Sequence, residues 1–306
     1  MNLTPINQIN LYGLENKLDD LYYLFKQNRL PNKILLSGQK GCGKATMAFH
    51  LINRILSENE EYSYNVKNYQ INNKNRSFRL IQNFTNPNFH LVDILPDKKI
   101  IDINQIRSLI LDLNKSSFNS KPRFVLIDNI EFLNLSSVNA LLKILEEPND
   151  NIYFILINNG KKILDTLKSR CLDFKISFSN AKSIEISNKL LEKNLFELIN
   201  KNLINYYFTP GNVLNLIKFA NENSLDLKDI DLKNFLIFLI NKCYYKKETI
   251  IKYLIYDFLE LFIRNCSDYI YSNKYNYFLK RIHELKKYNL DDESFFIEFE
   301  TKILNV

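Results

Sequence analysis

Short runs of apolar residues alternate with segments of helical periodicity along the first part of the chain, up to about residue 178. Each run is apolar at almost every position, which is typical of parallel strands covered by helices on both faces. The pattern therefore predicts an α/β domain with a parallel sheet at residues 1–178. The expected strands are 33–37, 89–95, 123–128, 152–157 and 172–176, and the expected helices are about 13–28, 44–57, 103–114, 135–147 and 161–169.

The pattern changes after Ser179. All six glycines and all seven prolines lie at or before Gly211, so the rest of the chain contains neither of the strong helix breakers. Apolar residues there recur at helical spacing, as they do between residues 251 and 258. We therefore expect a small helical domain at 179–222 and a separate helical bundle at 225–306.

The composition is that of an ordinary globular protein, with 46% hydrophobic and 25% charged residues. The N-terminal segment has no apolar core of signal-peptide length, and apolar runs such as 235–240 are far too short to span a membrane. A cytoplasmic protein with no membrane partner is therefore expected. The four cysteines form no C-x-x-C pair, which argues against a zinc site and against a disulfide framework.

The net charge of +7 is compatible with a nucleic-acid partner. However, no single basic stripe stands out in the sequence, and a general excess of lysine in an Asn- and Ile-rich chain explains the charge equally well. Charge alone therefore leaves direct contact with DNA open.

Residues 38–46, GQKGCGKAT, lie between an expected strand and an expected helix. Their spacing matches the phosphate-binding loop G-x-x-x-x-G-K, in which glycines let successive backbone N–H groups face phosphate oxygens. The helix that starts near Lys44 adds the positive end of its dipole, and the Lys44 ammonium would bridge the outer phosphates. A plain strand-to-helix turn is the less favoured interpretation. The predicted nucleotide site consists of Gly38, Gly41, Gly43, Lys44, Thr46 and Asp128.

Ala45 departs from this motif, because working loops carry serine or threonine after the lysine to hold magnesium. Thr46 comes one position later and lies roughly 100° further around a helix of 3.6 residues per turn, so its hydroxyl should point elsewhere. The magnesium ion would lose one protein ligand, and we assign no metal-binding residue.

The segment RFVLIDNIE at 123–131 is the second motif. An apolar run that ends in an aspartate, here Asp128, has the Walker B form, in which the carboxylate helps to hold the magnesium–nucleotide complex. Hydrolytic sites of this form usually place a glutamate next, whereas Asn129 carries an amide that cannot accept a proton from water. Glu131 could take over that role only if the loop were reshaped.

Two further motifs follow, NALLKILEEP at 139–148 and LDTLKSRC at 164–171. Periodicity alone would make the first of them a buried helix with a charged tail. Together with the two Walker segments, however, these motifs resemble the clamp-loader branch of the AAA+ ATPases. The resemblance extends over roughly residues 11–216.

This resemblance implies a role for the sequence Ser169-Arg170-Cys171. In the family, the arginine of this motif reaches across a subunit boundary to the γ-phosphate in the neighbouring ATP site. Arginine suits the role because its planar fork can bridge phosphate oxygens and neutralise developing charge. Arg170, with Ser169 beside it, is therefore the predicted catalytic element that acts in trans. A solvated arginine at a helix end is the alternative interpretation.

The resemblance also implies the architecture of the whole chain, an α/β fold followed by an all-α fold. An AAA+ P-loop domain is expected at 1–178, a helical lid domain at 179–222 and a helical oligomerisation collar at 225–306. Active family members carry a nucleotide-sensing arginine in the lid, where this chain has Gly211 and Asn212.

Many family members carry a four-cysteine zinc module after the first helix. The corresponding residues 58–88 of this chain contain no cysteine, so no zinc is expected. Their polar, Asn-rich sequence is interpreted as a surface insertion with weak structure.

Three requirements for hydrolysis are thus absent: the hydroxyl at 45, the glutamate at 129 and the sensing arginine near 211. The pattern resembles non-hydrolytic subunits of the DNA polymerase III clamp loader rather than the gamma/tau subunits. The resemblance implies a hetero-oligomer with gamma/tau and delta subunits that loads the sliding clamp on primed DNA during replication. Arg170 would complete the ATP site of a gamma/tau neighbour. No intrinsic ATPase activity is expected, although the loop could hold ATP or ADP without turnover.

Two alternatives remain open. An ATP-hydrolysing enzyme, either gamma/tau-like or another P-loop ATPase, would need magnesium held through water at Ala45 and Glu131 as a substitute base. A stand-alone DNA-binding module would bind DNA tightly and with strong salt dependence in the absence of partners. Nothing in the sequence requires this second alternative.

Overall fold

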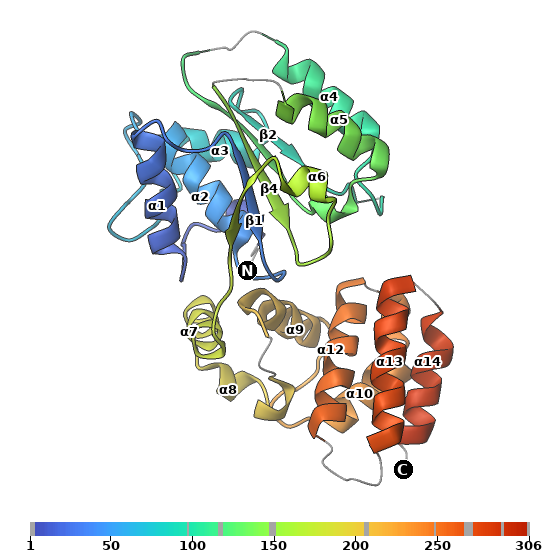
Figure 1. Cartoon of the computed structure of the whole chain (residues 1–306). Coiled ribbons are helices and arrows are strands. Elements are labelled where there is room, and N and C mark those ends of the chain that lie inside the picture. The colour runs from blue at the N-terminus through green and yellow to red at the C-terminus, as the bar shows by residue number, and fades with distance from the viewer. Residues whose placement is uncertain are drawn as a thin grey trace. The chain divides into compact units, whose positions relative to one another are not determined.

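The computed structural model describes residues 4–96, 98–115, 119–146, 151–204, 208–247, 249–265, 272–288 and 291–304. The chain folds into two compact units, Met1–Lys182 and Ser183–Val306. The first unit is built around a sheet and the second is all-helical (Figure 1). The predicted fold class, α/β followed by all-α, is confirmed. The finer division of the helical part into 179–222 and 225–306 stays a prediction.

The sheet of the first unit has five strands in the order β2-β3-β4-β1-β5, and every neighbouring pair is parallel. All five predicted strands are confirmed, with ends that differ by no more than a few residues. Their bounds are Lys33–Ser37 for β1, Phe89–Val92 for β2, Arg123–Ile127 for β3, Ile152–Asn158 for β4 and Leu172–Lys175 for β5.

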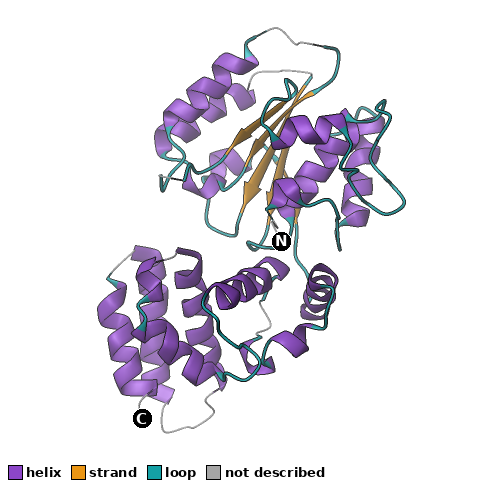
Figure 2. Ribbon diagram, turned by 180° about the vertical axis from the view of Figure 1, so that it is seen from behind, coloured by secondary structure: helices purple, strands orange, loops and turns teal. Residues whose placement is uncertain are grey.

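Helices cover both faces of this sheet, as the continuous apolar runs predict (Figure 2). Successive side chains of a strand point to opposite faces. On β1, Ile34 and Leu36 join a hydrophobic cluster with α1, α2 and α3, whereas Leu35 joins a second cluster with α4 and α5. The helices are α1 (Glu15–Lys26), α2 (Lys44–Leu56), α3 (Arg76–Gln82), α4 (Ile103–Leu113), α5 (Leu135–Glu146) and α6 (Asp165–Lys168).

Helix α6 is much shorter than the expected 161–169. Gly160 has a φ of 85°, and Leu164 is in an extended conformation as the N-cap of α6. The Asn158 side chain donates a hydrogen bond of 3.0 Å to the carbonyl oxygen of Lys161, which holds this segment as a loop. Because of this loop the helix begins only at Asp165, and Arg170 comes two residues after its single turn.

The expectation of weak structure at residues 58–88 is wrong. Four apolar side chains of this segment are buried in the cluster beneath α1 and α2, and they are Tyr64, Ile71, Phe78 and Ile81. Asn75 is fully buried and caps α3, because its side chain accepts from the Phe78 N–H at 2.7 Å and donates to the Tyr62 carbonyl at 2.7 Å. The apolar residues have no regular spacing among the asparagines, so periodicity could not reveal them.

His50 of α2 also ties this segment down. The Tyr64 hydroxyl lies 2.9 Å from Nδ1 of His50, and the Gln8 carbonyl oxygen lies 3.0 Å from Nε2. Because a carbonyl can only accept, Nε2 carries the proton and Nδ1 accepts from Tyr64. Burial lowers the pKa of His50 to about 4, so this imidazole is neutral in the folded protein.

We expect His50 to make the stability of the first unit depend on pH. The unfolded chain binds a proton near pH 6.5 while the folded chain resists it down to about pH 4, so stability falls as the pH decreases through this window. Integration predicts a loss on the order of 2 kcal/mol in the free energy of unfolding between pH 7 and pH 5. Urea unfolding at both pH values measures it, and the variant His50→Gln serves as a comparison. An equal loss in the variant and the parent chain would contradict the assignment to His50.

The second unit is formed by helices that share one hydrophobic core, which extends from Leu195 to Leu304. Among its largest buried side chains are Phe235, Phe258, Phe278 and Tyr256, so much of this core is aromatic. In the described residues, no helix combines the length and apolar character needed to cross a membrane. The helices are α7 (Asn180–Leu191), α8 (Leu195–Leu198), α9 (Pro210–Glu222), α10 (Leu232–Asn241), α11 (Tyr244–Lys247), α12 (Thr249–Asn265), α13 (Ser272–Tyr288) and α14 (Asp292–Phe299).

Candidate functional site

The carboxyl ends of the five parallel strands meet at one edge of the sheet, where α/β proteins bind their ligands. The phosphate-loop sequence follows β1 at this edge, Asp93 follows β2, Asp128 follows β3 and Asn159 follows β4. The structure therefore brings most of the predicted nucleotide-site residues together in the first unit. It adds two side chains, those of Asp93 and Asn159, that we did not predict.

Two glycines give the loop its path. Gly38 has a φ of 148°, and a Cβ atom built on it would lie 2.0 Å from the backbone oxygen of Ile176, just beyond β5. Gly43 is left-handed, with a φ of 75°, and forms the N-cap of α2. Side chains disfavour both conformations, so these positions require glycine. The resulting curl is the backbone shape that phosphate binding needs.

Lys44 is the first residue of α2 and is only 3% exposed. Its ammonium group donates to the backbone oxygens of Gly38 at 2.9 Å and Gln39 at 2.6 Å. Burial lowers the pKa of Lys44 to about 8, although the carboxylates of Asp128 and Glu131 favour the charged form. The Lys44 ammonium group is thus held by hydrogen bonds within the loop that would surround a phosphate.

The residues after Lys44 offer little to a magnesium ion. Ala45 is half-buried and packs against the hydrophobic cluster of α1 and α2, so the position next to the lysine presents a methyl group instead of a hydroxyl. Thr46 is half-buried on the following position of α2. The described residues contain no cluster of three or more His, Cys, Asp or Glu side chains that could hold a metal ion. The loop therefore presents its backbone and the Lys44 ammonium to a ligand, with no hydroxyl at position 45.

The Walker B carboxylate lies next to a ladder of polar side chains. Burial, and after it the neighbouring Asp93 carboxylate, raise the pKa of Asp128 to about 6. The Asn129 amide donates to Asp93 Oδ1 at 2.7 Å and accepts from the Asn159 side chain at 2.9 Å. Asn129 also has a φ of 55°, a left-handed conformation that asparagine tolerates. Both ends of its amide are thus engaged, and the side chain bridges the ends of β2 and β4.

Glu131 lies in the short helix Ile130–Phe132 after β3. Its Oε2 accepts from the backbone N–H of Asn159 at 3.2 Å. Its charge also acts on Lys44, which places the carboxylate in the electrostatic surroundings of the loop. Glu131 is therefore a carboxylate held near the loop by a hydrogen bond. It lies two residues beyond position 129, where hydrolytic sites carry the glutamate.

Arg170 lies beyond α6 and is not joined to Lys44 or Asp128 by any hydrogen bond or ion pair in the structure. Its Nε donates to Glu146 Oε1 at 2.9 Å, its Nη2 also contacts that oxygen, and its Nη1 donates to the Thr166 carbonyl at 2.8 Å. About a third of the Arg170 side chain, 34%, is exposed. The predicted finger therefore bonds to α5 and α6, and part of its side chain is accessible at the surface.

The neighbours of Arg170 have structural contacts. Ser169 is exposed, and its hydroxyl donates to the Thr166 carbonyl at 3.1 Å at the end of α6. Cys171 is half-buried, and burial raises the pKa of its thiol to about 11. A thiol with so high a pKa is unreactive at neutral pH, and the Cys171 side chain packs against the hydrophobic cluster of α4 and α5.

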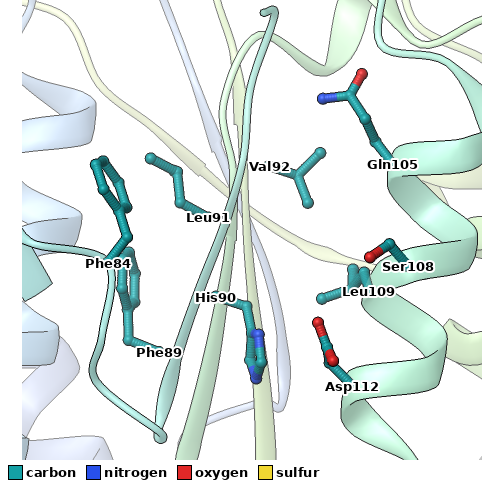
Figure 3. Close-up of a pocket in the computed structure, with 9 residues that line it drawn as sticks. All are labelled: Phe84, Phe89, His90, Leu91, Val92, Gln105, Ser108, Leu109 and Asp112. Carbon is teal, nitrogen blue, oxygen red and sulfur yellow. The ribbon is translucent and has the colours of Figure 1, made fainter.

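A separate pocket of about 330 Å³ lies along β2, one of the two edge strands of the sheet, next to α4. Figure 3 shows His90 and Val92 on the side of β2 that faces α4, and Phe89 and Leu91 on the other side. None of the predicted nucleotide-site residues lines it. We did not predict this pocket, because its lining comes from β2, from α4 and from Phe84 after α3, which only the fold brings together.

Asp93 and Asn159 could have been found from the sequence with one further step. Each follows an apolar run that we predicted as a strand or as part of one. If the strands are parallel, polar residues that follow neighbouring strands gather at the same edge. The spatial order of the strands, which is not their order in the chain, decides which of these residues actually touch.

The strand order, the phosphate loop after β1 and the Walker B carboxylate after β3 define a P-loop protein of the AAA+ type. A family model described as "DNA polymerase III, delta subunit" matches residues 13–180. The chain belongs to this family.

Curated relatives agree with this assignment. The chain is 30% identical over 172 residues to DNA polymerase III subunit delta' of Buchnera aphidicola subsp. Baizongia pistaciae, which covers 54% of this chain and 49% of the relative. It is 29% identical over 178 residues to subunit delta' of Bacillus subtilis, covering 57% and 50% of the two chains. The chain thus spans about half the length of these relatives. The resemblance to the clamp-loader family is confirmed, and both of these relatives are delta' subunits.

Among solved structures, the chain is similar to a DNA polymerase III gamma-subunit-related protein from Thermotoga maritima. The TM-score is 0.47 at 18% sequence identity, and the match covers 92% of this chain and 96% of the other.

Proposed function

We propose that this chain is a non-hydrolytic, delta-prime-like subunit of the DNA polymerase III clamp loader. In this role it helps to load the sliding clamp on primed DNA, in a hetero-oligomer with gamma/tau and delta subunits. Arg170 supplies a guanidinium group to the ATP site of a gamma/tau neighbour. The observation that carries the proposal is the contrast between an accessible Arg170 and a phosphate loop that lacks the groups for hydrolysis.

The phosphate loop and Walker B segment of this chain support the non-hydrolytic part of the proposal. Ala45 presents a methyl group where magnesium needs an oxygen ligand, and the Asn129 amide is engaged by Asp93 and Asn159. An amide has no basic group that could take a proton from water at neutral pH. The glycines and Lys44 of the loop are present, so we propose that the loop can hold ATP or ADP without turnover. We also propose that the chain binds no zinc.

The chemistry of Arg170 supports the other part. A guanidinium group stays protonated and can contact two phosphate oxygens at once, which stabilises the charge that develops during phosphoryl transfer. Its 34% exposure leaves it accessible to a second subunit. The cation therefore serves a neighbouring site better than its own.

Reconstitution tests the proposal directly. We expect this chain to co-purify with the gamma/tau and delta subunits of its own organism, and to show no ATP turnover by itself. ATP hydrolysis and clamp loading by the assembled complex should require the chain. Failure to co-purify, or full activity of the complex without the chain, would contradict the proposal.

The alternative is an ATP-hydrolysing subunit of the gamma/tau kind, and one observation favours it. Glu131 is a carboxylate in the electrostatic surroundings of Lys44, so it could act as a base if the loop moved. Steady ATP turnover by the purified chain, abolished by Lys44→Ala, would support this alternative instead.

A further inference from the structure

Arg170 is held by two different helices. Glu146, the last residue of α5, accepts from Nε of Arg170 at 2.9 Å and also contacts Nη2 through the same oxygen, Oε1. Thr166 of α6 accepts from Nη1 at 2.8 Å through its backbone oxygen. A side chain with several rotatable bonds is thus fixed by contacts on three of its nitrogen atoms.

The guanidinium group of Arg170 has more N–H donors than these contacts use. A guanidinium group has five N–H donors, one on Nε and two on each terminal nitrogen. The contacts with Glu146 and Thr166 use one donor on each of the three nitrogens. Among the contacts of the described residues, one N–H therefore remains on Nη1 and one on Nη2. Two donors on the terminal nitrogens are enough for two oxygens of one phosphate group.

The ion pair contributes little to the stability of the fold. The side chains of Arg170 and Glu146 are 34% and 54% exposed, and ion pairs in such positions are weakened by water and salt. A carboxylate at the C-terminal end of a helix is also unfavourable, because the helix dipole is negative there. Glu146 thus occupies a position that α5 itself disfavours, and Arg170 is the cation that compensates for it.

Holding the arginine changes the entropy of phosphate binding. A freely rotating arginine loses considerable rotamer freedom when it binds a phosphate, and a side chain that is already ordered loses less. Catalysis by a positioned charge also requires that the charge be in place before the reaction starts. The contact with Glu146 meets both requirements and leaves free the second N–H of Nη2, while the second N–H of Nη1 is not used by Thr166.

We propose that Glu146 is a positioning residue for Arg170. It orders the guanidinium group so that one N–H on each of Nη1 and Nη2 is available to the phosphate of a nucleotide bound by the neighbouring subunit. This inference rests on the proposed function of Arg170 as a finger that acts in trans.

The test uses the full chain in a reconstituted clamp loader, with the variants Glu146→Gln and Glu146→Ala. Glutamine keeps an oxygen acceptor but removes the charge, whereas alanine removes both. We expect kcat for ATP hydrolysis at the neighbouring site to fall by about 10-fold or more in Glu146→Ala and by less in Glu146→Gln. KM for ATP should stay unchanged, because the nucleotide is bound by the other subunit.

Glu222→Ala is the matched control. Glu222 is also 54% exposed and also pairs with a cation, Lys218, but it lies in α9 of the second unit. Its removal should leave kcat unchanged. Melting temperatures of the Glu146 and Glu222 variants should both stay within about 2 °C of the parent chain.

A double variant separates positioning from a structural effect and from failure of the proposed function. In an Arg170→Ala background, Glu146→Ala should cause no further loss, because nothing remains to be positioned. A further loss there, unchanged kcat in the single Glu146 variants, or a higher kcat would each overturn the positioning role. If Arg170→Ala itself leaves turnover unchanged, the proposed function fails, whatever the Glu146 variants show.

Discussion

Replacing Arg170 by alanine is expected to lower ATP hydrolysis at the neighbouring site of a reconstituted clamp loader by about 10³-fold or more, the range in which a supplied arginine accelerates phosphoryl transfer. The alanine variant lacks the cation that would offset the negative charge developing on the transferred phosphoryl group. Clamp loading should fall with it. A loader with several ATP sites keeps turnover at the others, so the loss should appear as one missing phase in a single-turnover experiment.

Two other arginine variants make this result specific. Arg170→Lys keeps the positive charge but loses the planar fork, so its turnover should lie between those of the parent chain and the alanine variant. Arg76→Ala removes an exposed arginine at the start of α3 and should leave turnover unchanged. Full activity of the Arg170→Ala complex would sink the finger assignment and return Arg170 to a solvated arginine paired with Glu146.

Replacing Gly38 by alanine is expected to destabilise the first unit by about 3 kcal/mol or more. The new Cβ would lie 2.0 Å from the Ile176 backbone oxygen, and the φ of 148° is already unfavourable for alanine. Relief is difficult because the Ile176 N–H donates to the Ser37 carbonyl at 2.7 Å, which ties the two segments together. Urea unfolding followed by far-ultraviolet circular dichroism measures the change.

Gly160→Ala is the matched control for steric contact. Gly160 has a φ of 85°, but its added Cβ would meet its nearest neighbour, the Gly38 oxygen, only at 3.8 Å, an ordinary contact distance. We expect a loss of about 1–2 kcal/mol from the backbone conformation alone. Equal losses at Gly38 and Gly160 would show that the close approach to Ile176 is relieved at no cost.

The sheet could be predicted because its central strands are buried on both faces. Strands β1, β3 and β4 are buried on both faces, so they read as uninterrupted apolar runs, and the loop after β1 has a spacing that few other sequences share. The segment 58–88 shows the opposite case. Its buried residues, including Tyr64 and Phe78, have no regular period, so local pattern could not distinguish them from a surface loop. Only the fold brings the Tyr64 hydroxyl to His50 and lets Asn75 accept from the Phe78 N–H.

The sequence by itself determined the chemical groups available to this protein: a phosphate loop with Lys44, a methyl group at 45, an amide at 129 and a guanidinium at 170. These are covalent facts, and the local patterns around them follow from periodic burial. Only the tertiary structure decided which groups meet. The crossovers of the parallel sheet put Asp93 next to Asn129, although 36 positions separate them in the chain, and the end of α5 brings Glu146 to Arg170. Such contacts depend on the spatial order of strands and helices, which long-range packing sets and no local pattern records.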